Sequence, residues 1–136
     1  MDRYYATLYS AEENFLIDVA ELKAPGVAFY VARDAEQLLG FGAIASRGAD
    51  EAGIGWAELK RMYVAPAARG RRIGRLLLDQ LLDHAKGQGI AVLRLETGDK
   101  QMEALSLYRS VGFAQRGPFA DYPDNESSVY MELKLA

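Results

Sequence analysis

The stretch MYVAPAARGRRIGR, residues 62–75, joins the end of a predicted strand to the start of the most strongly amphipathic helix in the chain. The strand spans Trp56 to Val64, and Pro66 stops it. From Gly70 to about Lys86, apolar residues recur at the spacing of a helix with one buried face; they are Ile73, Leu76, Leu77, Leu81, Leu82 and Ala85. Gly87 is expected to cap this helix. The stretch therefore predicts a strand, a turn rich in glycine and arginine, and a helix.

The order of the remaining elements predicts a mixed sheet. Two β-prone runs, Val27–Ala32 and Leu38–Ser46, predict a hairpin. The other expected elements are two short helices within residues 4–22, a strand at Ile90–Thr97, a helix from Gln101 to about Ser110, the start of a strand at Val111–Ala114, a loop at Arg116–Ser127 and a strand at Ser128–Leu135. The strand–helix–strand order over residues 56–97 predicts a parallel pair with a right-handed crossover. The predicted fold class is α/β (an α+β mixed sheet) with helices on its faces, in one domain of residues 1–136.

The composition excludes several classes of protein. The chain of 136 residues has no cysteine and one histidine, His84. A disulfide framework, a thiolate metal site and a cysteine nucleophile are therefore excluded, and no metal is expected. His84 lies late in the predicted long helix, where we expect it to be exposed and not catalytic. No apolar run approaches the ~18–20 residues of a membrane span and no signal peptide is recognised, so we expect a cytoplasmic protein without a membrane partner.

The charge is distributed unevenly along the chain. The net charge is −3, yet Lys60 to Arg75 carries six cations and no acid. Subtracting these six charges from the net charge leaves −9 for the rest of the chain. A basic spot on an acidic body suits a compact anionic ligand, such as a pyrophosphate, better than a long polyanion. We therefore expect no nucleic-acid partner, and a nucleic-acid binder is the least favoured of the functions considered.

The predicted turn is a candidate phosphate site. The first amides of a helix have no intrahelical acceptor, and the helix dipole adds positive potential there. Gly70 and Gly74 would let a ligand approach the backbone. Arg71, Arg72 and Arg75 each oppose the dipole by about 0.3–1 kcal/mol, which a bound polyphosphate would reverse. The turn has neither the GxxxxGK[ST] nor the GxGxxG spacing, and a solvated basic helix start remains an alternative.

Two motifs resemble those of the GNAT superfamily of N-acetyltransferases, which transfer an acetyl group from acetyl-CoA to an amine. The family's Q/R-x-x-G-x-G/A motif is matched by Arg69 and Gly74 after a strand end at residues 62–64, with Arg72 where the family has glycine. Its Asn-x-x-Ala-x-x-Leu-Tyr-x-x-x-Gly-Phe motif is similar to residues 101–113, with Gln101 in place of asparagine. The resemblance covers residues 26–136. Family members start with a strand, whereas Met1–Ser10 is predicted to be helical, so we expect that strand to be missing or the chain to begin late.

The resemblance implies a GNAT-like fold with acetyl-CoA as co-substrate. The pantetheine arm would lie between Met62–Val64 and Glu96–Thr97, and the turn amides would hold the pyrophosphate. The residues expected to bind it are Met62, Tyr63, Val64, Arg69, Gly70, Arg71, Arg72, Ile73, Gly74, Arg75 and Gln101.

The resemblance also implies catalytic residues. Tyr108 matches the tyrosine that protonates the departing thiolate; its alternative role is core packing. With reference pKa values of about 10 and 8.5 that transfer is uphill by ~2 kcal/mol, so Tyr108 needs a lowered pKa or must act first as a hydrogen-bond donor. Glu58 matches the base of histone-type members and Glu96 that of enzymes acetylating ribosomal-protein N-termini. Glu58 is favoured, although either glutamate could simply pair with Lys60, Arg61 or Arg94.

The predicted function is transfer of acetyl from acetyl-CoA to a primary amine, of a small molecule or a peptide, by direct attack with a Glu base and a Tyr acid. The alternative is a CoA-binding regulatory module without turnover, which Arg72 and Gln101 leave open. The acceptor amine is not identified by the sequence, and a homodimer is left open.

Overall fold

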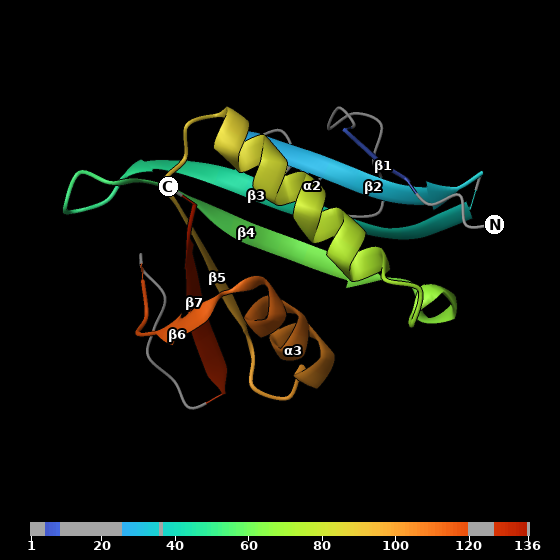
Figure 1. Ribbon diagram of the computed structural model, residues 1–136. Helices are drawn as coiled ribbons and strands as arrows, with labels where there is room; N and C mark the ends of the chain where they lie inside the picture. Colours follow the sequence, from blue (N-terminus) through green and yellow to red (C-terminus); the bar gives the residue numbers. More distant parts are fainter. Residues whose placement is uncertain (1–4, 9–25, 36, 120–126, 136) are drawn as a thin grey trace.

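The computed structural model describes residues 5–8, 26–35, 37–119 and 127–135, and the statements below concern these residues (Figure 1). The elements in chain order are β1 (Tyr5–Leu8), β2 (Val27–Asp34), β3 (Gln37–Ala49), β4 (Gly55–Val64), the 3-10 helix η2 (Pro66–Ala68), α2 (Ile73–Gly87), β5 (Val92–Gly98), α3 (Met102–Val111), β6 (Ala114–Arg116) and β7 (Ser128–Lys134). The strands form one sheet in the order β1-β2-β3-β4-β5-β7-β6.

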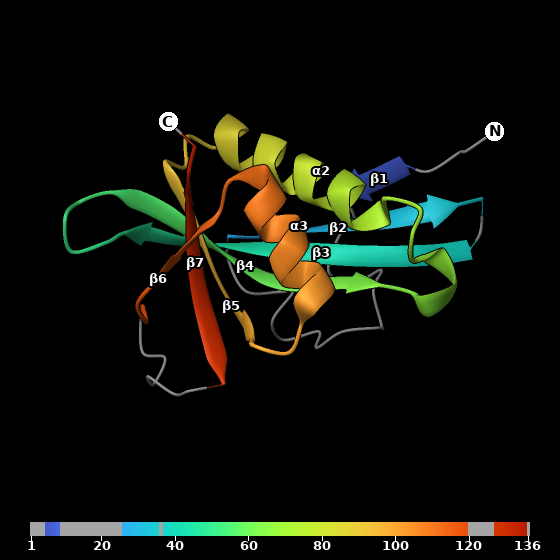
Figure 2. The ribbon, with the colours of Figure 1, turned by 60° about the horizontal axis from the view of Figure 1, so that its bottom comes forward.

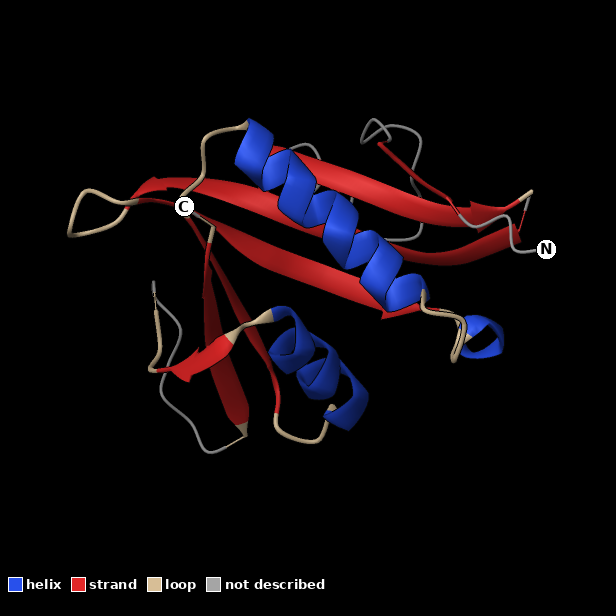
Figure 3. Cartoon of the chain, in the orientation of Figure 1, coloured by secondary structure: helices blue, strands red, loops and turns tan. Residues whose placement is uncertain are grey.

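The sheet is mixed, as the sequence predicts. Strands β1 to β4 pair antiparallel in succession, β4 and β5 pair parallel across α2, and β7 pairs antiparallel with both β5 and β6. Helix α2 lies across β2–β4 and α3 lies beside β5, on the same side of the sheet (Figures 2 and 3). The main core lies between these two helices and the sheet. It contains Leu78 and Leu81 of α2, Leu105 of α3, and Leu59 and Leu95 of the sheet. Neither α2 nor α3 has the length and apolar character that crossing a bilayer requires.

The first strand is present, which corrects the sequence prediction. Tyr5–Leu8 is strand β1 and pairs antiparallel with β2 from Tyr5↔Arg33 to Leu8↔Tyr30. The helical spacing of so few residues is a weak signal, and pairing with a distant strand overrides it. The prediction of a helix at this position and of a missing first strand is therefore wrong. The rest of the predicted N-terminal helices lies outside the described residues.

The end of α2 also differs slightly from the prediction. Gly87 is the last helical residue, and Gly89, with φ +74°, takes the left-handed conformation expected of a terminating glycine. The helix also buries Leu78, which the predicted apolar stripe did not include. These are boundary changes, and the buried face of the helix is as predicted.

A β-bulge in β4 opens the sheet next to α3. The β3–β4 register passes from Ala43↔Arg61 to Ile44↔Leu59, so Lys60 is an extra residue in β4. A bulge bends its strand and increases the local twist. The β4–β5 pairing ends at Leu59↔Leu95, although β4 continues to Val64 and β5 to Gly98. The two strands therefore diverge beyond Leu59 and Leu95.

Candidate functional site

Two adjoining cavities occupy the divergence between β4 and β5. The smaller cavity, of about 380 Å³, is lined by Phe41, Leu59, Lys60, Met62, Tyr63, Leu95, Glu96, Thr97, Gln101, Ala104 and Tyr108. The larger cavity, of about 800 Å³, extends to the start of α2, and the predicted binding residues that line it are Met62, Tyr63, Val64, Arg69, Gly70, Arg72, Ile73, Gly74, Arg75 and Gln101. Tyr108 lines both, so it lies where the two cavities meet. Of the predicted binding residues, Arg71 alone lines neither cavity.

The turn before α2 has the backbone geometry of an anion site. Gly70 and Arg72 both have positive φ, +83° and 64°, and Arg72 is the N-cap residue of α2. The Arg72 side chain does not cap the helix, so the first amides of α2 lack the acceptor that a capping side chain supplies, and residues 72–75 line the larger cavity. Left-handed residues in such a turn create a concave array of N–H groups that binds phosphate.

Cations line the larger cavity from two sides. Arg69, Arg72 and Arg75 line the larger cavity from the α2 side, and Lys100 lines it from the start of α3. Arg75 also pairs with Asp79 at 3.0 Å, a half-exposed contact that contributes little. The first turn of α2 contains no acidic residue. The site is therefore complementary to a polyanion such as a pyrophosphate.

Gly74 lies close to a side chain of α3. A Cβ atom built there would lie 3.0 Å from Leu107 Cδ2 and 3.7 Å from Val64 Cγ2. An alanine at this position would require the end of the Leu107 side chain to shift by a few tenths of an ångström, and a larger side chain would extend into the cavity that Gly74 lines. The glycine of the motif therefore favours close packing and leaves the backbone accessible.

Tyr108 is a buried donor at the junction of the cavities. Its side chain is 6% exposed, and its ring meets Phe113 edge to face at 5.7 Å. Burial raises the pKa of the Tyr108 phenol to about 12. The prediction that its pKa could be lowered is therefore wrong, because burial disfavours the charged phenolate. The other prediction, that Tyr108 acts as a hydrogen-bond donor, fits a phenol that keeps its proton.

The two candidate bases differ in their access to the cavities. Glu96 lines the smaller cavity and accepts a hydrogen bond from Ser128 Oγ at 2.8 Å. Glu58 is 3% exposed and lines neither cavity. Its Oε1 accepts from Arg47 at 2.8 and 3.2 Å, and its Oε2 lies 3.8 Å from Lys60 Nζ. The ion-pair alternative considered for Glu58 is thus present, with Arg47 as a partner that the sequence did not indicate.

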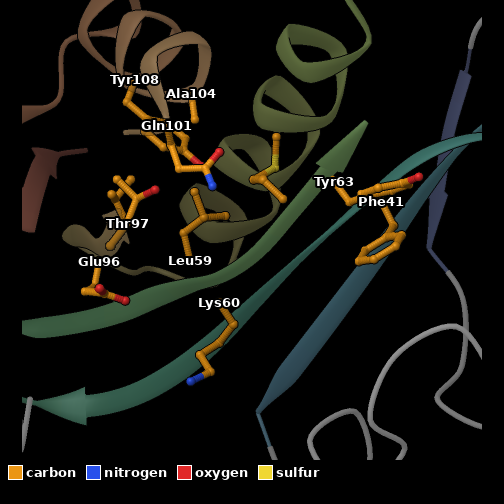
Figure 4. A pocket seen from close by; sticks show the side chains of 11 residues that line it. Phe41, Leu59, Lys60, Tyr63, Glu96, Thr97, Gln101, Ala104 and Tyr108 are labelled. Carbon is orange, nitrogen blue, oxygen red and sulfur yellow. The ribbon is translucent and has the colours of Figure 1, made fainter. Parts of the chain in front are cut away.

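The smaller cavity reaches both faces of the sheet. Leu59 and Leu95 belong to the core under the helices, and side chains alternate along a strand, so Glu96 faces the opposite side. Figure 4 shows Tyr108, Ala104 and Gln101 together beside the helices, with Glu96 and Lys60 at a distance from them along the strands. The smaller cavity is therefore lined by residues that belong to both faces of the sheet, and Tyr108 is among them.

Several lining residues were missed by the sequence analysis. Ala104 is a fixed position of the second motif and could have been included. Phe41 has no local signal, because the pairing of distant strands brings it to the cavity. Lys100 has none either, because the connection between β5 and α3 places it there. His84 is half-buried, so the prediction that it is exposed is wrong; its Nδ1 lies 3.4 Å from Tyr30 Oη, and it lines neither cavity. Residues 120–126 of the predicted loop lie outside the described residues. Within the described ranges, no three His, Cys, Asp or Glu side chains are grouped as metal ligands.

Replacing Arg72 with glycine is expected to stabilise the protein. A left-handed conformation costs a residue with a Cβ roughly 1–2 kcal/mol, whereas glycine adopts it freely but loses more chain entropy on folding. We expect a net gain of about 0.5–1 kcal/mol and a rise in Tm of about 2–4 °C. Urea unfolding measures the change, with Arg71→Gly as the matched control, since Arg71 has no positive φ. Equal or lower stability of Arg72→Gly than of Arg71→Gly would contradict the assignment of strain to residue 72.

Comparison with known proteins gives consistent matches. A sequence model of the acetyltransferase (GNAT) domain matches residues 25–115. An IAA acetyltransferase of Azospirillum brasilense is 46% identical over 135 residues, which are 99% of this chain and 86% of the relative. A Klebsiella pneumoniae crystal structure classed as an acyl-CoA N-acyltransferase superposes with a TM-score of 0.81 at 31% identity, covering 98% of each chain. The PaiA N-acetyltransferase of Thermoplasma acidophilum, solved with coenzyme A, has a TM-score of 0.66 at 25% identity, covering 80% of this chain and 61% of that one.

Proposed function

Since the chain belongs to the GNAT acetyltransferase family, we propose that it is an N-acetyltransferase that uses acetyl-CoA to acetylate a primary amine of a small molecule or peptide. The observation that carries the proposal is the end of β4–β5 pairing at Leu59↔Leu95, which leaves a passage between a phosphate-binding turn and a buried tyrosine. Residues 1–136 are proposed to act as one catalytic domain.

The residues present fit coenzyme A. The amides of the Gly70–Arg75 turn and the arginines beside it would hold the pyrophosphate. Residues Met62–Val64 pair with β3 on one side, and on the side toward β5 they have no strand partner among the described residues. Their free backbone edge would accept the amide groups of pantetheine as an added strand. When bound, acetyl-CoA supplies the acetyl group as an activated thioester.

We propose that Glu96 receives a proton from the ammonium group of the acceptor. The resulting neutral amine then attacks the thioester carbonyl of acetyl-CoA. An ordinary carboxylate and an alkylammonium differ by about 6 pKa units, or ~8 kcal/mol. Glu96 therefore acts through a water relay or on the small neutral fraction of the amine. A backbone amide near Val64 donates to the carbonyl oxygen as negative charge develops on it. No covalent bond to the protein is required.

Tyr108 is proposed to stabilise the departing thiolate. With a phenol pKa of about 12 and a thiol near 8.5, complete proton transfer is uphill by about 3.5 units, or ~5 kcal/mol. The hydroxyl therefore donates a hydrogen bond while the C–S bond breaks. The acceptor loses two protons as the N–C bond forms, one neutralising the thiolate and one reaching solvent.

Glu58 is proposed to position its neighbours, with Glu96 as the base. The sequence favoured Glu58, but both oxygens of its carboxylate face cations, and it lines neither cavity. Glu96 accepts a hydrogen bond from one neutral hydroxyl and lines the smaller cavity, where we place the acceptor. Access to the reacting atoms is the first requirement for a general base.

The proposal is tested by thiol release from acetyl-CoA over a panel of polyamines, aminoglycosides, amino acids and peptides. We expect acetyl-CoA to raise the Tm by several degrees at concentrations well above its Kd, because it binds only the folded protein. We expect at least one amine to release thiol at a rate above hydrolysis. A raised Tm without thiol release across the panel would instead favour the regulatory module, and no change in Tm would contradict coenzyme binding.

A further inference from the structure

Glu96 lies where strand β5 is paired on one side. On the β4 side, the pairing ends one residue earlier, at Leu95, and the smaller cavity opens there. On the other side, β5 is paired with β7 throughout its length, and Tyr130 lies opposite Glu96. Contacts across the sheet that fix the Glu96 side chain therefore come from β7.

A serine at the start of β7 meets this carboxylate. Ser128 is the diagonal neighbour of Glu96, because Tyr130 lies opposite Glu96 and side chains two residues apart share a face of the sheet. The Ser128 Oγ donates a hydrogen bond to Glu96 Oε2 at 2.8 Å. Among the described residues, the Glu96 carboxylate makes no other hydrogen bond or ion pair. Its Oε1 is therefore available to a ligand in the smaller cavity, which Glu96 lines.

The backbone of Ser128 is fixed relative to Glu96. Strand β7 is paired with β5 at every position of Val92–Gly98, and Ser128 belongs to the last of these pairs. Directly beyond that pair, the Asp99 N–H donates a hydrogen bond to the Ser127 carbonyl oxygen at 2.8 Å. The Ser128 hydroxyl is therefore presented to Glu96 from paired backbone, which favours a precise position for the carboxylate that it holds.

We propose that Ser128 is a positioning residue for the acetyl transfer. Its hydroxyl holds Oε2 of Glu96, so that Oε1 receives the proton of the acceptor ammonium directly or through water. The inference rests on the proposed function, in which Glu96 is the base. A glutamate side chain turns about several bonds, and fixing one oxygen removes much of that freedom before the acceptor binds. Ser128 keeps its own proton and adds no positive charge beside the ammonium.

The test compares Ser128→Thr with Ser128→Val, which differ by a hydroxyl in place of a methyl and are both suited to a strand. In thiol-release assays with an amine that the wild type acetylates, we expect Ser128→Val to lower kcat by about 10- to 50-fold and Ser128→Thr by no more than about threefold. The KM for acetyl-CoA should stay within about twofold in both variants, because Ser128 lines neither cavity. The matched control is Ser46→Val, the same change at an exposed residue of β3 that lines neither cavity, and it should keep full activity.

A double variant separates a positioning role from a structural one. With Glu96→Gln there is no basic carboxylate to orient, so adding Ser128→Val should lower kcat by no more than about twofold further. The inference would be overturned if Ser128→Val lowered kcat as much in that background as in the wild type. Wild-type kcat in Ser128→Val, or a loss in Ser128→Thr equal to that in Ser128→Val, would overturn it as well.

Crystal structures of the wild type and Ser128→Val give a readout that does not depend on turnover. We expect the wild type to keep Glu96 Oε2 at hydrogen-bond distance from Ser128 Oγ, and the variant to show the Glu96 carboxylate turned away or in more than one conformation. The same single conformation of Glu96 in both crystals would overturn the inference. Absence of turnover with every amine would instead contradict the proposed acetyl transfer, and with it the catalytic role of Ser128, even where the crystals show that Ser128 orients Glu96.

Discussion

Tyr108→Phe is expected to lower kcat about 100- to 1000-fold, the effect of removing one hydrogen-bond donor from a site of developing charge. The ring remains packed against Phe113 in a 6%-exposed position, so only the hydroxyl is lost. The KM for acetyl-CoA should change little, because the phosphate turn and the β4 backbone are untouched. Steady-state thiol release measures both constants.

The pH profile of the same variant distinguishes the two roles considered for Tyr108. Because burial raises the phenol pKa to about 12, the hydroxyl keeps its proton throughout the usual assay range. Activity should therefore not fall through ionisation of Tyr108 as the pH rises to about 10. An alkaline loss of wild-type activity that disappears in Tyr108→Phe would mean that the pKa is lowered in the complex. Tyr30→Phe, which removes a partly buried hydroxyl outside both cavities, is the control and should keep full activity.

The parts of the site that the sequence predicted are those built from consecutive residues. The turn before α2 and the helix that follows are local structures, so the spacing of Arg69, Gly70 and Gly74 predicted residues that line the larger cavity, where we propose the phosphate site. The departure at Arg72 also has a local explanation, because this residue adopts a left-handed conformation that glycine favours. The arginine keeps that conformation and adds a guanidinium to the cavity wall.

The parts that the sequence could not predict depend on pairing between distant strands. Strand β1 exists because Tyr5–Leu8 pairs with β2, which its own spacing did not reveal. The bulge at Lys60 and the end of pairing at Leu59↔Leu95 depend on register with β3 and β5. The choice between Glu58 and Glu96 depends on that register, because it determines which carboxylate lies beyond the last paired residues. The motifs thus predict the proposed coenzyme site, whereas the proposed acceptor side depends on the pairing of the sheet.

Glu96→Gln is expected to lower kcat/KM for the acceptor by about 100- to 10,000-fold near neutral pH, the range for loss of a general base. Glutamine keeps the size of the side chain and can still accept from Ser128 Oγ, so the fold and coenzyme binding should be retained. The deficit should shrink as the pH approaches the pKa of the acceptor amine, because the neutral nucleophile then no longer needs a base. A deficit that is constant with pH would indicate that Glu96 binds the acceptor without removing its proton.

Glu58→Gln is the matched variant, and it separates the two candidate bases by stability as well as by rate. This change removes the charge of a carboxylate that is 3% exposed, so Arg47 and Lys60 then face a neutral amide. Because Arg47 is 40% exposed, water solvates its charge and limits the loss of folding stability. We expect unfolding to become easier by about 1–2 kcal/mol, with kcat reduced far less than in Glu96→Gln. A Glu58→Gln protein that unfolds like the wild type yet loses kcat as severely as Glu96→Gln would instead make Glu58 the base. The acceptor would then have to reach a carboxylate that lines neither cavity and that the side chains of Arg47 and Lys60 contact.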